Sequence, residues 1–438
     1  MNKKPSYGQL LVAAYGGVSI IGAALLMLPI SSSQPGTTSL LQAWFTAMSA
    51  LTVTGLTVVN TATHWTIFGQ AVILLLIQVG GLGLMVFSSV FLLLFGVRMN
   101  LGYKVLAAQE QDQSNFTGIA TLIRQIVWLV LVIEIIGFVL LYGLFPASPG
   151  QSFAHKVFFA LFHAVSSFNG AGFDISGASM VPFRHLNLVN TVVIILIFLG
   201  SLGYLVLLEL IGLFKRRPRL SLHSRVVLIV TISIALFGAG FYFLTEYTTS
   251  LAGLSWNQKL VESLFQSITR TCGFVTVPVT SWSEPFQFLS IIMMFIGASP
   301  GSVGGGIKTT TFAVIVLAAW SLARGKREVV VMEREIDSAS VSKAFTVTVL
   351  ALVMVCVGTL ILMVLENLPF LEVLFEVVSA LATVGLTMGI TEHLSPLSTF
   401  IIGMLMFIGR IGVLSIVVLL GQSEADRIHY MKETIIIG

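Results

Sequence analysis

Eight stretches of this sequence are apolar over enough residues to cross a membrane, and most of them contain no ionisable residue. A helix needs about 20 apolar residues to cross the hydrocarbon core of a bilayer. Charged residues make up only 10% of the chain, whereas about 25% is usual in soluble domains. The sequence therefore predicts an all-α membrane protein. The predicted spans lie near residues 10–30, 65–97, 122–144, 186–208, 226–244, 285–323, 345–365 and 394–421.

Four shorter apolar segments alternate with these spans, near residues 41–52, 155–169, 258–271 and 370–382. A helix of about 12 residues reaches only about 18 Å, well short of a core that is roughly 30 Å thick. We therefore expect each segment to be re-entrant. It enters the membrane as a half-helix and returns to the same side as extended chain.

Lys and Arg are distributed unequally between the two sides of these spans. The two termini and three links on one side hold 17 of the 23 basic residues, whereas the loops on the other side hold three. Because cytoplasmic loops collect positive charge, we expect a multi-pass protein of the cell membrane with both termini in the cytoplasm. Lipid phosphates are sufficient partners for the basic links, and no nucleic-acid partner is expected. The three links are residues 98–124, 215–225 and 324–343.

The four short segments share a frame when they are aligned on one glycine. In each, a serine lies six residues before a glycine that is followed by Leu or Phe. The sequences are SALTVTGL (49–56), SSFNGAGF (166–173), SITRTCGF (267–274) and SALATVGL (379–386). A second glycine follows 24 to 28 residues later, at Gly80, Gly200, Gly297 and Gly409. Two independent registers indicate an internal fourfold repeat.

Each repeat consists of a span, a re-entrant segment and a second span (M1–P–M2), so all four repeats have the same orientation in the membrane. Parallel repeats can surround an axis along the membrane normal. The predicted fold is therefore four M1–P–M2 repeats with pseudo-fourfold symmetry around one central pore. The predicted repeats are residues 1–100, 101–217, 218–327 and 328–438, the last with the C-terminal tail.

The segments that end at the aligned glycines are candidates for an ion-selectivity filter. Extended backbone at membrane depth is tolerated where it lines water, and rings of carbonyl oxygens replace the hydration shell of K⁺. The sequence Thr383-Val384-Gly385-Leu386 is close to the TVGY of potassium-channel filters, and no carboxylate occupies the five positions that end at any of the glycines. The alternative is that these glycines only allow close helix packing. The candidate filter residues are Val53, Thr54, Gly55, Gly170, Ala171, Gly172, Thr271, Cys272, Gly273, Thr383, Val384 and Gly385, with potassium expected at Gly55, Gly172, Gly273 and Gly385.

Over nearly its whole length the chain resembles the Trk/Ktr/HKT superfamily of potassium-uptake proteins, and most closely the KtrB type of membrane subunit. The resemblance implies potassium uptake across the cytoplasmic membrane, with sodium as an activator or coupling ion. It also implies a homodimer and a cytosolic, nucleotide-binding RCK-type (KtrA-like) ring as regulator. The motifs that carry it are TVTGL (52–56), QVGGLGLM (78–85), FNGAGFD (168–174), RTCGF (270–274), GASPGSVGGGIKTTT (297–311), ATVGLT (382–387) and GRIGVLSI (409–416).

The second span of the third repeat is too long for one helix. Residues 285–323 would form a helix of about 58 Å, nearly twice the membrane core, and glycine and proline disfavour helix interiors. The family resemblance implies that the broken segment obstructs the pore as a gate, and the alternative is a passive kink. The candidate gate residues are Gly297, Ala298, Ser299, Pro300, Gly301, Ser302, Val303, Gly304, Gly305, Gly306, Lys308 and Arg410.

Three basic residues, Arg270, Lys308 and Arg410, lie within membrane segments. A central Lys or Arg costs about 3 kcal/mol, so each is expected to have a partner or to face water. Arg410 either faces the pore, where its charge would oppose cations, or pairs with a carboxylate such as Glu134 or Glu376. We expect Arg270 to brace its loop through hydrogen bonds. Lys308 is a candidate for holding carbonyls of the glycine-rich stretch.

The fourfold register favours a gated potassium pore over an alternating-access carrier of another solute, because carriers usually show two long halves. The sequence contains no nucleophile–base pair and no metal-ligand cluster. We therefore expect a transport protein with K⁺ as substrate, no bound cofactor and no enzyme activity.

Overall fold

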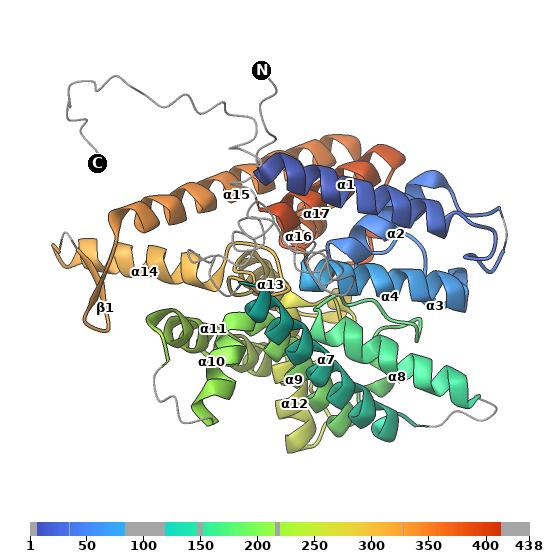
Figure 1. Cartoon of the computed structure of the whole chain (residues 1–438), viewed down its shortest axis with the longest axis horizontal. Coiled ribbons are helices and arrows are strands. Elements are labelled where there is room, and N and C mark those ends of the chain that lie inside the picture. Colours follow the sequence, from blue (N-terminus) through green and yellow to red (C-terminus); the bar gives the residue numbers. More distant parts are fainter. Residues whose placement is uncertain are drawn as a thin grey trace.

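The computed structural model describes residues 7–34, 36–83, 119–146, 152–214, 220–326 and 328–412. Regular structure in these ranges is almost entirely helical, and many of the helices run in broadly similar directions (Figure 1). The all-α membrane fold is thus confirmed. An antiparallel hairpin joins two of the helices through β1 (Val329–Val331) and β2 (Arg334–Ile336). Short helical turns are α3 (Thr61–His64), η1 (Val181–Phe183), η2 (Thr269–Thr271), η3 (Val279–Ser281) and η4 (Thr391–His393).

Four long helices have the length and composition to cross a membrane. They contain 20 to 28 residues, and apolar side chains such as Leu236 and Val364 lie exposed on their surfaces. An apolar exterior suits a lipid environment. The helices coincide with the predicted first span of each repeat and are α1 (Tyr7–Leu26), α7 (Ile119–Leu144), α11 (Leu222–Thr245) and α15 (Ser338–Leu365).

Four shorter helices of 12 to 16 residues occupy the predicted re-entrant segments. Two of them begin at a serine that accepts a backbone N–H of the first turn: Ser39 from Gln42 and Ser152 from His155. Such caps fix where a helix starts. The C-terminal halves are buried, so these helices point their ends into the protein. They are α2 (Leu40–Leu51), α8 (Phe153–Phe168), α12 (Trp256–Ile268) and α16 (Phe370–Leu381).

Each second span begins with a helix that stops after 16 residues or fewer. These helices are α4 (Ile67–Leu82), α9 (Asn187–Leu202), α13 (Glu284–Phe295) and α17 (Pro396–Ile411). In three of them the next residue is a glycine with φ between 85° and 95°, namely Gly83, Gly203 and Gly412. Their ψ values are 129° to 142°, so each has a backbone conformation that glycine adopts readily and other residues do not, and the helix ends there.

The predicted span 186–208 is therefore not one straight helix. Of the predicted spans 65–97 and 394–421, the described residues are helical as far as Leu82 and Ile411. After Gly203 the chain forms α10 (Tyr204–Phe214), which is bent by 105° from α9. The parts of the other two predicted spans that follow Gly83 and Gly412 lie outside the described residues.

The break predicted within 285–323 is present. Helix α13 ends at Phe295, and α14 (Thr309–Ala323) begins only after the glycine-rich stretch. We call residues 297–308, which follow Ile296 and precede α14, the 297–308 loop.

The second glycine of the repeat brings each second helix onto the short helix of its own repeat. A Cβ atom built on Gly80 would lie 1.9 Å from the carbonyl oxygen of Leu51, the last residue of α2. Any side chain would push the two backbones apart. Gly297 differs, because a Cβ atom built on it would lie 1.8 Å from the carbonyl oxygen of Gly305, in the 297–308 loop itself. The contacts equivalent to Gly80–Leu51, also at 1.9 Å, are Gly200–Phe168 and Gly409–Leu381.

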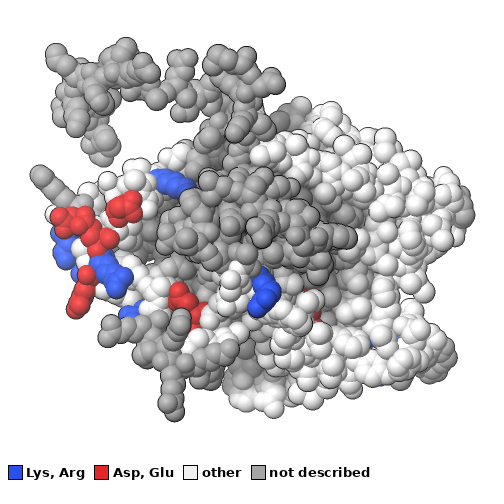
Figure 2. Space-filling model, in the orientation of Figure 1, with Lys and Arg blue, Asp and Glu red and all other residues white. Residues whose placement is uncertain are grey.

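Charged side chains gather at one end of the molecule. Figure 2 shows Lys, Arg, Asp and Glu at the left, and a mostly uncharged surface over the described part of the face in view. The predicted cytoplasmic link 324–343 includes the β1–β2 hairpin, where Glu328, Glu333, Arg334 and Glu335 are exposed. Figure 1 places this hairpin at the same end.

Gly409→Ala should destabilise the protein, because its methyl group would overlap the Leu381 carbonyl. Overpacking of this kind costs about 1–3 kcal/mol. Gly240→Ala is the matched control: Gly240 also lies in a helix, and nothing lies within 4 Å of its Cβ position. Thermal unfolding in detergent should show a lower midpoint for Gly409→Ala and an equal or higher one for Gly240→Ala. Equal midpoints for both variants would contradict the packing argument.

Candidate functional site

The four short helices lead into four glycine loops, residues 52–55, 169–172, 270–273 and 382–385, which touch one another in a closed ring. The order is first, second, third, fourth and back to the first. At each contact an added Cβ would overlap the backbone of the next loop. These Cβ distances are 2.1 Å from Gly55 to the Ala171 oxygen, 2.4 Å from Gly172 to the Gly273 nitrogen, 2.9 Å from Gly273 to the Gly385 carbonyl carbon, and 1.9 Å from Gly385 to the Thr54 oxygen.

Three of the four glycine loops share an unusual backbone. Each has positive φ at its glycine and again two residues earlier, while the residue between has none. Alternating signs of φ rotate successive carbonyls towards the same side. Gly170 adopts this conformation without strain, whereas for Val53 and Thr383 it is strained, because both are β-branched. The φ values are 58° and 94° at Val53 and Gly55, 66° and 68° at Gly170 and Gly172, and 49° and 92° at Thr383 and Gly385.

The aligned serines form hydrogen bonds with the backbone of these loops. The Ser49 hydroxyl accepts the N–H of Gly55 at 3.0 Å, and the Ser379 hydroxyl accepts the N–H of Gly385 at 3.1 Å. In the second loop the Ser166 hydroxyl donates instead to the Phe173 carbonyl at 2.7 Å. A serine six residues before the glycine therefore fixes the loop against its helix.

The third loop departs from this pattern. Thr271 belongs to the turn η2, and Gly273 does not have positive φ. Its serine, Ser267, donates to Ala235 of α11. Arg270 is buried, and its Nη1 donates to the carbonyls of Met293 and Gly297, both at 3.2 Å, and of Ile296. Arg270 thus braces the third loop against the end of α13 and the start of the 297–308 loop.

The electrostatics of the ring favour a cation. The C-terminal ends of the short helices carry partial negative charge, and they lead directly into the four loops. The loops contain no carboxylate. Glu376, on α16, is buried and accepts hydrogen bonds from the hydroxyls of Thr387 and Thr391, beyond the fourth loop. The charged residue within the loops is Arg270, whose guanidinium donates to the carbonyls of Met293, Ile296 and Gly297. Backbone carbonyls and helix dipoles are the groups of the ring that would attract a cation.

The 297–308 loop lies against this ring. The N–H of Gly305 donates to the Thr383 hydroxyl at 2.9 Å. A Cβ built on Gly170 would lie 3.5 Å from a methyl group of Val303. On its other side the loop pairs with the end of α9: Ser299 N–H donates to Ser201 at 3.0 Å. The loop is thus attached to both the second and the fourth repeats.

Arg410 joins this loop to two further helices. From α17, its two terminal nitrogens donate to the carbonyls of Val303, in the loop, and Gly80, in α4. The alternative of an ion pair with Glu134 or Glu376 is wrong, because both partners of Arg410 are backbone carbonyls. Lys308 holds the same loop, since its Nζ donates to the Gly304 carbonyl at 2.6 Å.

A buried hydrogen-bond network that the sequence did not predict lies beside the second loop. Glu134 of α7 accepts hydrogen bonds from Gln78 at 3.1 Å and from Asn169 at 2.9 Å. These side chains connect the first span of one repeat, the second span of the preceding repeat and a glycine loop. The network could have been suspected from the sequence, because Gln78 and Glu134 are polar residues within apolar segments, where such groups need partners.

Comparison with known proteins gives one consistent result. The chain is 39% identical over 434 residues to Ktr system potassium uptake protein D of Bacillus subtilis (strain 168), covering 98% of this chain and 96% of that protein. It is 36% identical over 435 residues to Ktr system potassium uptake protein B of Vibrio alginolyticus, covering 98% and 94%. The crystal structure of the potassium transporter TrkH from Vibrio parahaemolyticus matches with a TM-score of 0.76 at 19% identity, covering 96% of this chain and 86% of that one.

The structural match establishes the fold, and the sequence matches extend over almost the whole chain. A family model for TrkH, described as a cation transport protein, matches residues 8–428. The chain is a transport protein rather than an enzyme. It belongs to the TrkH family of cation transport proteins.

Proposed function

We propose that this protein takes up K⁺ across the cytoplasmic membrane through a pore at the centre of the glycine-loop ring. The ring is the observation that carries the proposal. Four loops from four M1–P–M2 repeats meet there, and three of them have the alternating φ that turns carbonyls towards one line. Such carbonyls can replace the hydration shell of a monovalent cation. The pseudo-fourfold arrangement and the filter residues are parts of this proposal.

The 297–308 loop is the gate in this proposal. It contacts the glycine loops through Gly305 and Val303, and Arg410 ties Val303 to Gly80. Movement of the loop away from the ring would require Nη1 of Arg410 to leave the Val303 carbonyl, while the bond from Nη2 to Gly80 keeps the guanidinium attached to α4. The positive charge of Arg410 also opposes cation occupancy beside the loop. Both effects hold the pore closed.

The remaining parts of the proposal are supported by family membership and charge. They are sodium dependence, a homodimer, and a cytosolic RCK-type, nucleotide-binding ring as regulator. We also propose that both termini and the β1–β2 hairpin lie in the cytoplasm. The exposed hairpin mixes acidic and basic residues, which suits a protein partner. The other proposed docking segments are 98–124 and the C-terminal tail; the tail and residues 98–118 lie outside the described residues.

Uptake of K⁺ and Rb⁺ in a cell that lacks its own potassium transport tests the function. Expression should restore growth at low K⁺, and added Na⁺ should increase the uptake rate. Uptake of neither ion by protein that reaches the membrane would contradict the proposal. Uptake that is unchanged by Na⁺ would contradict the sodium dependence alone.

Gly273→Ser should weaken selectivity for K⁺ over Na⁺. The backbone of Gly273 lacks positive φ, so the variant avoids that source of strain, but its Cβ would lie 2.9 Å from Gly385. The control is Gly240→Ser in α11, where φ is not positive and nothing lies within 4 Å of the added Cβ. Competition between Na⁺ and Rb⁺ uptake should change for Gly273→Ser and stay near wild type for Gly240→Ser. Unchanged competition in folded Gly273→Ser would overturn the filter assignment.

Arg410→Gln should increase K⁺ flux, most clearly without the regulatory ring. The variant loses both the guanidinium hydrogen bonds to Val303 and Gly80 and the positive charge. Arg410→Lys keeps the charge but cannot donate in the planar fork of a guanidinium. Its flux should lie between those of wild type and Arg410→Gln. Flux is measured in proteoliposomes and divided by the amount of folded protein. If neither variant exceeds wild type, Arg410 does not restrain the gate.

A further inference from the structure

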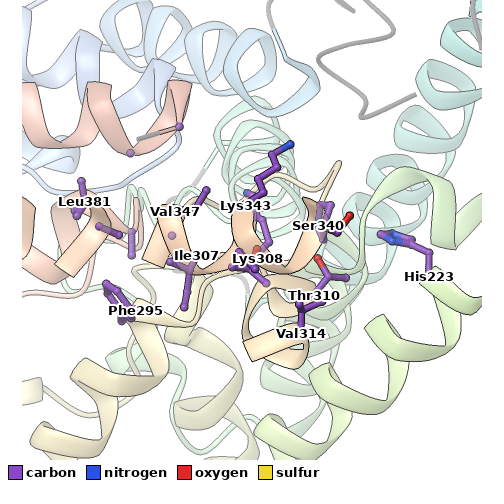
Figure 3. Close-up of a pocket in the computed structure, with 18 of the residues that line it drawn as sticks. His223, Phe295, Ile307, Lys308, Thr310, Val314, Ser340, Lys343, Val347 and Leu381 are labelled. Atoms are coloured by element: carbon purple, nitrogen blue, oxygen red, sulfur yellow. The ribbon is translucent and has the colours of Figure 1, made fainter. Parts of the chain in front are cut away.

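A cavity of about 530 Å³ lies beside the 297–308 loop and extends to Ala382, the first residue of the fourth glycine loop. Helices α11, α14, α15, α16 and α17 contribute to its walls. Figure 3 shows that its lining residues extend from Leu381, at the left, to His223, at the right. Its volume is within the range of about 300–1,000 Å³ that is usual for small-molecule sites.

One end of the cavity is polar and basic. Lys343, Lys308 and His223 line it together with the hydroxyl groups of Ser340 and Thr310 (Figure 3). Asp337, at the start of α15, is one nearby acidic residue, and its carboxylate accepts the N–H of Ser340 at 3.0 Å. Glu209 is another, since it interacts electrostatically with His223 and accepts the N–H of Ser221 at 3.0 Å. Both carboxylates are thus bonded to backbone N–H groups, and Lys343 and Lys308 are the cationic side chains that line the cavity with His223.

The other end of the cavity is apolar. Phe295, Val347 and Leu381 lie around it in Figure 3, and Val378 and Ala351 extend the same wall. These residues belong to helices within the membrane part of the fold, whereas Ser340 and Lys343 lie in the first two turns of α15, next to the charged hairpin. The cavity therefore changes from basic to apolar along the direction that runs from the charged end of the molecule into the membrane.

One wall of the cavity is the proposed gate itself. Pro300, Gly306, Ile307 and Lys308 all line it. A molecule in the cavity would contact the 297–308 loop in the conformation in which that loop lies against the glycine ring. A ligand shifts an equilibrium towards the conformation that it binds better, so an occupant of this cavity stabilises the closed position.

We propose that the cavity binds an anionic phospholipid of the cytoplasmic leaflet, and that the bound lipid holds the gate closed. Its phosphate lies at Lys343 and Lys308, and one acyl chain extends along Phe295, Val347 and Leu381. The gradient from basic to apolar matches an anionic head group joined to a hydrocarbon chain. A soluble nucleotide would leave the apolar end unfilled. The proposal rests on the proposed function for its effect on flux, but lipid binding itself does not depend on it.

The first measurement is native mass spectrometry of the full-length protein with phosphatidylglycerol or phosphatidylcholine. Wild type should retain phosphatidylglycerol in preference. Lys343→Glu reverses a charge at the basic end and should lower retention by at least about five-fold, since one basic residue near anionic lipid contributes about that factor. Val347→Trp fills the apolar end and should also lower it, although every charge remains. Lys326→Glu is the matched control, because Lys326 is exposed and does not line the cavity.

The second measurement is flux in proteoliposomes with and without phosphatidylglycerol. Phosphatidylglycerol should reduce the flux of wild type and of Lys326→Glu but not of Lys343→Glu or Val347→Trp. Retention by Lys343→Glu and Val347→Trp equal to wild type would overturn the lipid site. So would displacement of the lipid by ATP in wild type at millimolar concentration, which would assign the cavity to a soluble anion.

The two proposals fail in different ways. Absence of K⁺ flux in every lipid mixture would contradict the proposed function, and lipid retention would still be measured. Selective retention together with flux that is insensitive to phosphatidylglycerol would overturn the gating role of the lipid while the binding site stands.

Discussion

The close contact between a helix glycine and the carbonyl that ends a neighbouring helix is the constraint on which the rest of this structure depends. At Gly80, Gly200 and Gly409 the second helix of a repeat lies directly on the last carbonyl of the short helix. Because no side chain separates them, the end of the short helix has a fixed position. The glycine loop follows that end immediately, so the ring of loops inherits its geometry from these three contacts and from the Arg270 brace in the third repeat.

The sequence was sufficient for the parts of the fold that depend on the lengths of apolar runs. The long first helix and the short second helix of each predicted repeat follow from run length alone, whereas the shorter helices of the second spans do not. The ends of α4, α9 and α17 could not be predicted in this way. Apolar residues continue beyond Gly83, Gly203 and Gly412, and the decisive property is a backbone angle. Glycine is frequent in this chain, with 40 residues, so its presence alone does not identify a break.

The candidate site shows the same division. Its glycines and serines were found because they recur at fixed spacing. The partners of Arg410 were not, since the choice between a pore-facing charge and an ion pair considered only side chains. In the structure Arg410 donates to the carbonyls of Val303 and Gly80 instead. Because almost every residue has a backbone carbonyl that can accept a hydrogen bond, the sequence does not single out these two. The departure of the third loop was also hidden, because its sequence keeps the serine and the glycine while its backbone differs.

Thr383 belongs to two structures at once. Its backbone is strained into the left-handed region within a glycine loop, and its hydroxyl accepts the N–H of Gly305 from the 297–308 loop. Any event that changes the conformation of Thr383 therefore also changes a hydrogen bond to the other loop. Thermodynamic linkage requires the reverse to hold with the same free energy. If the ring binds the ion as proposed, the apparent affinity for the ion depends on the position of the loop as well as on the ring.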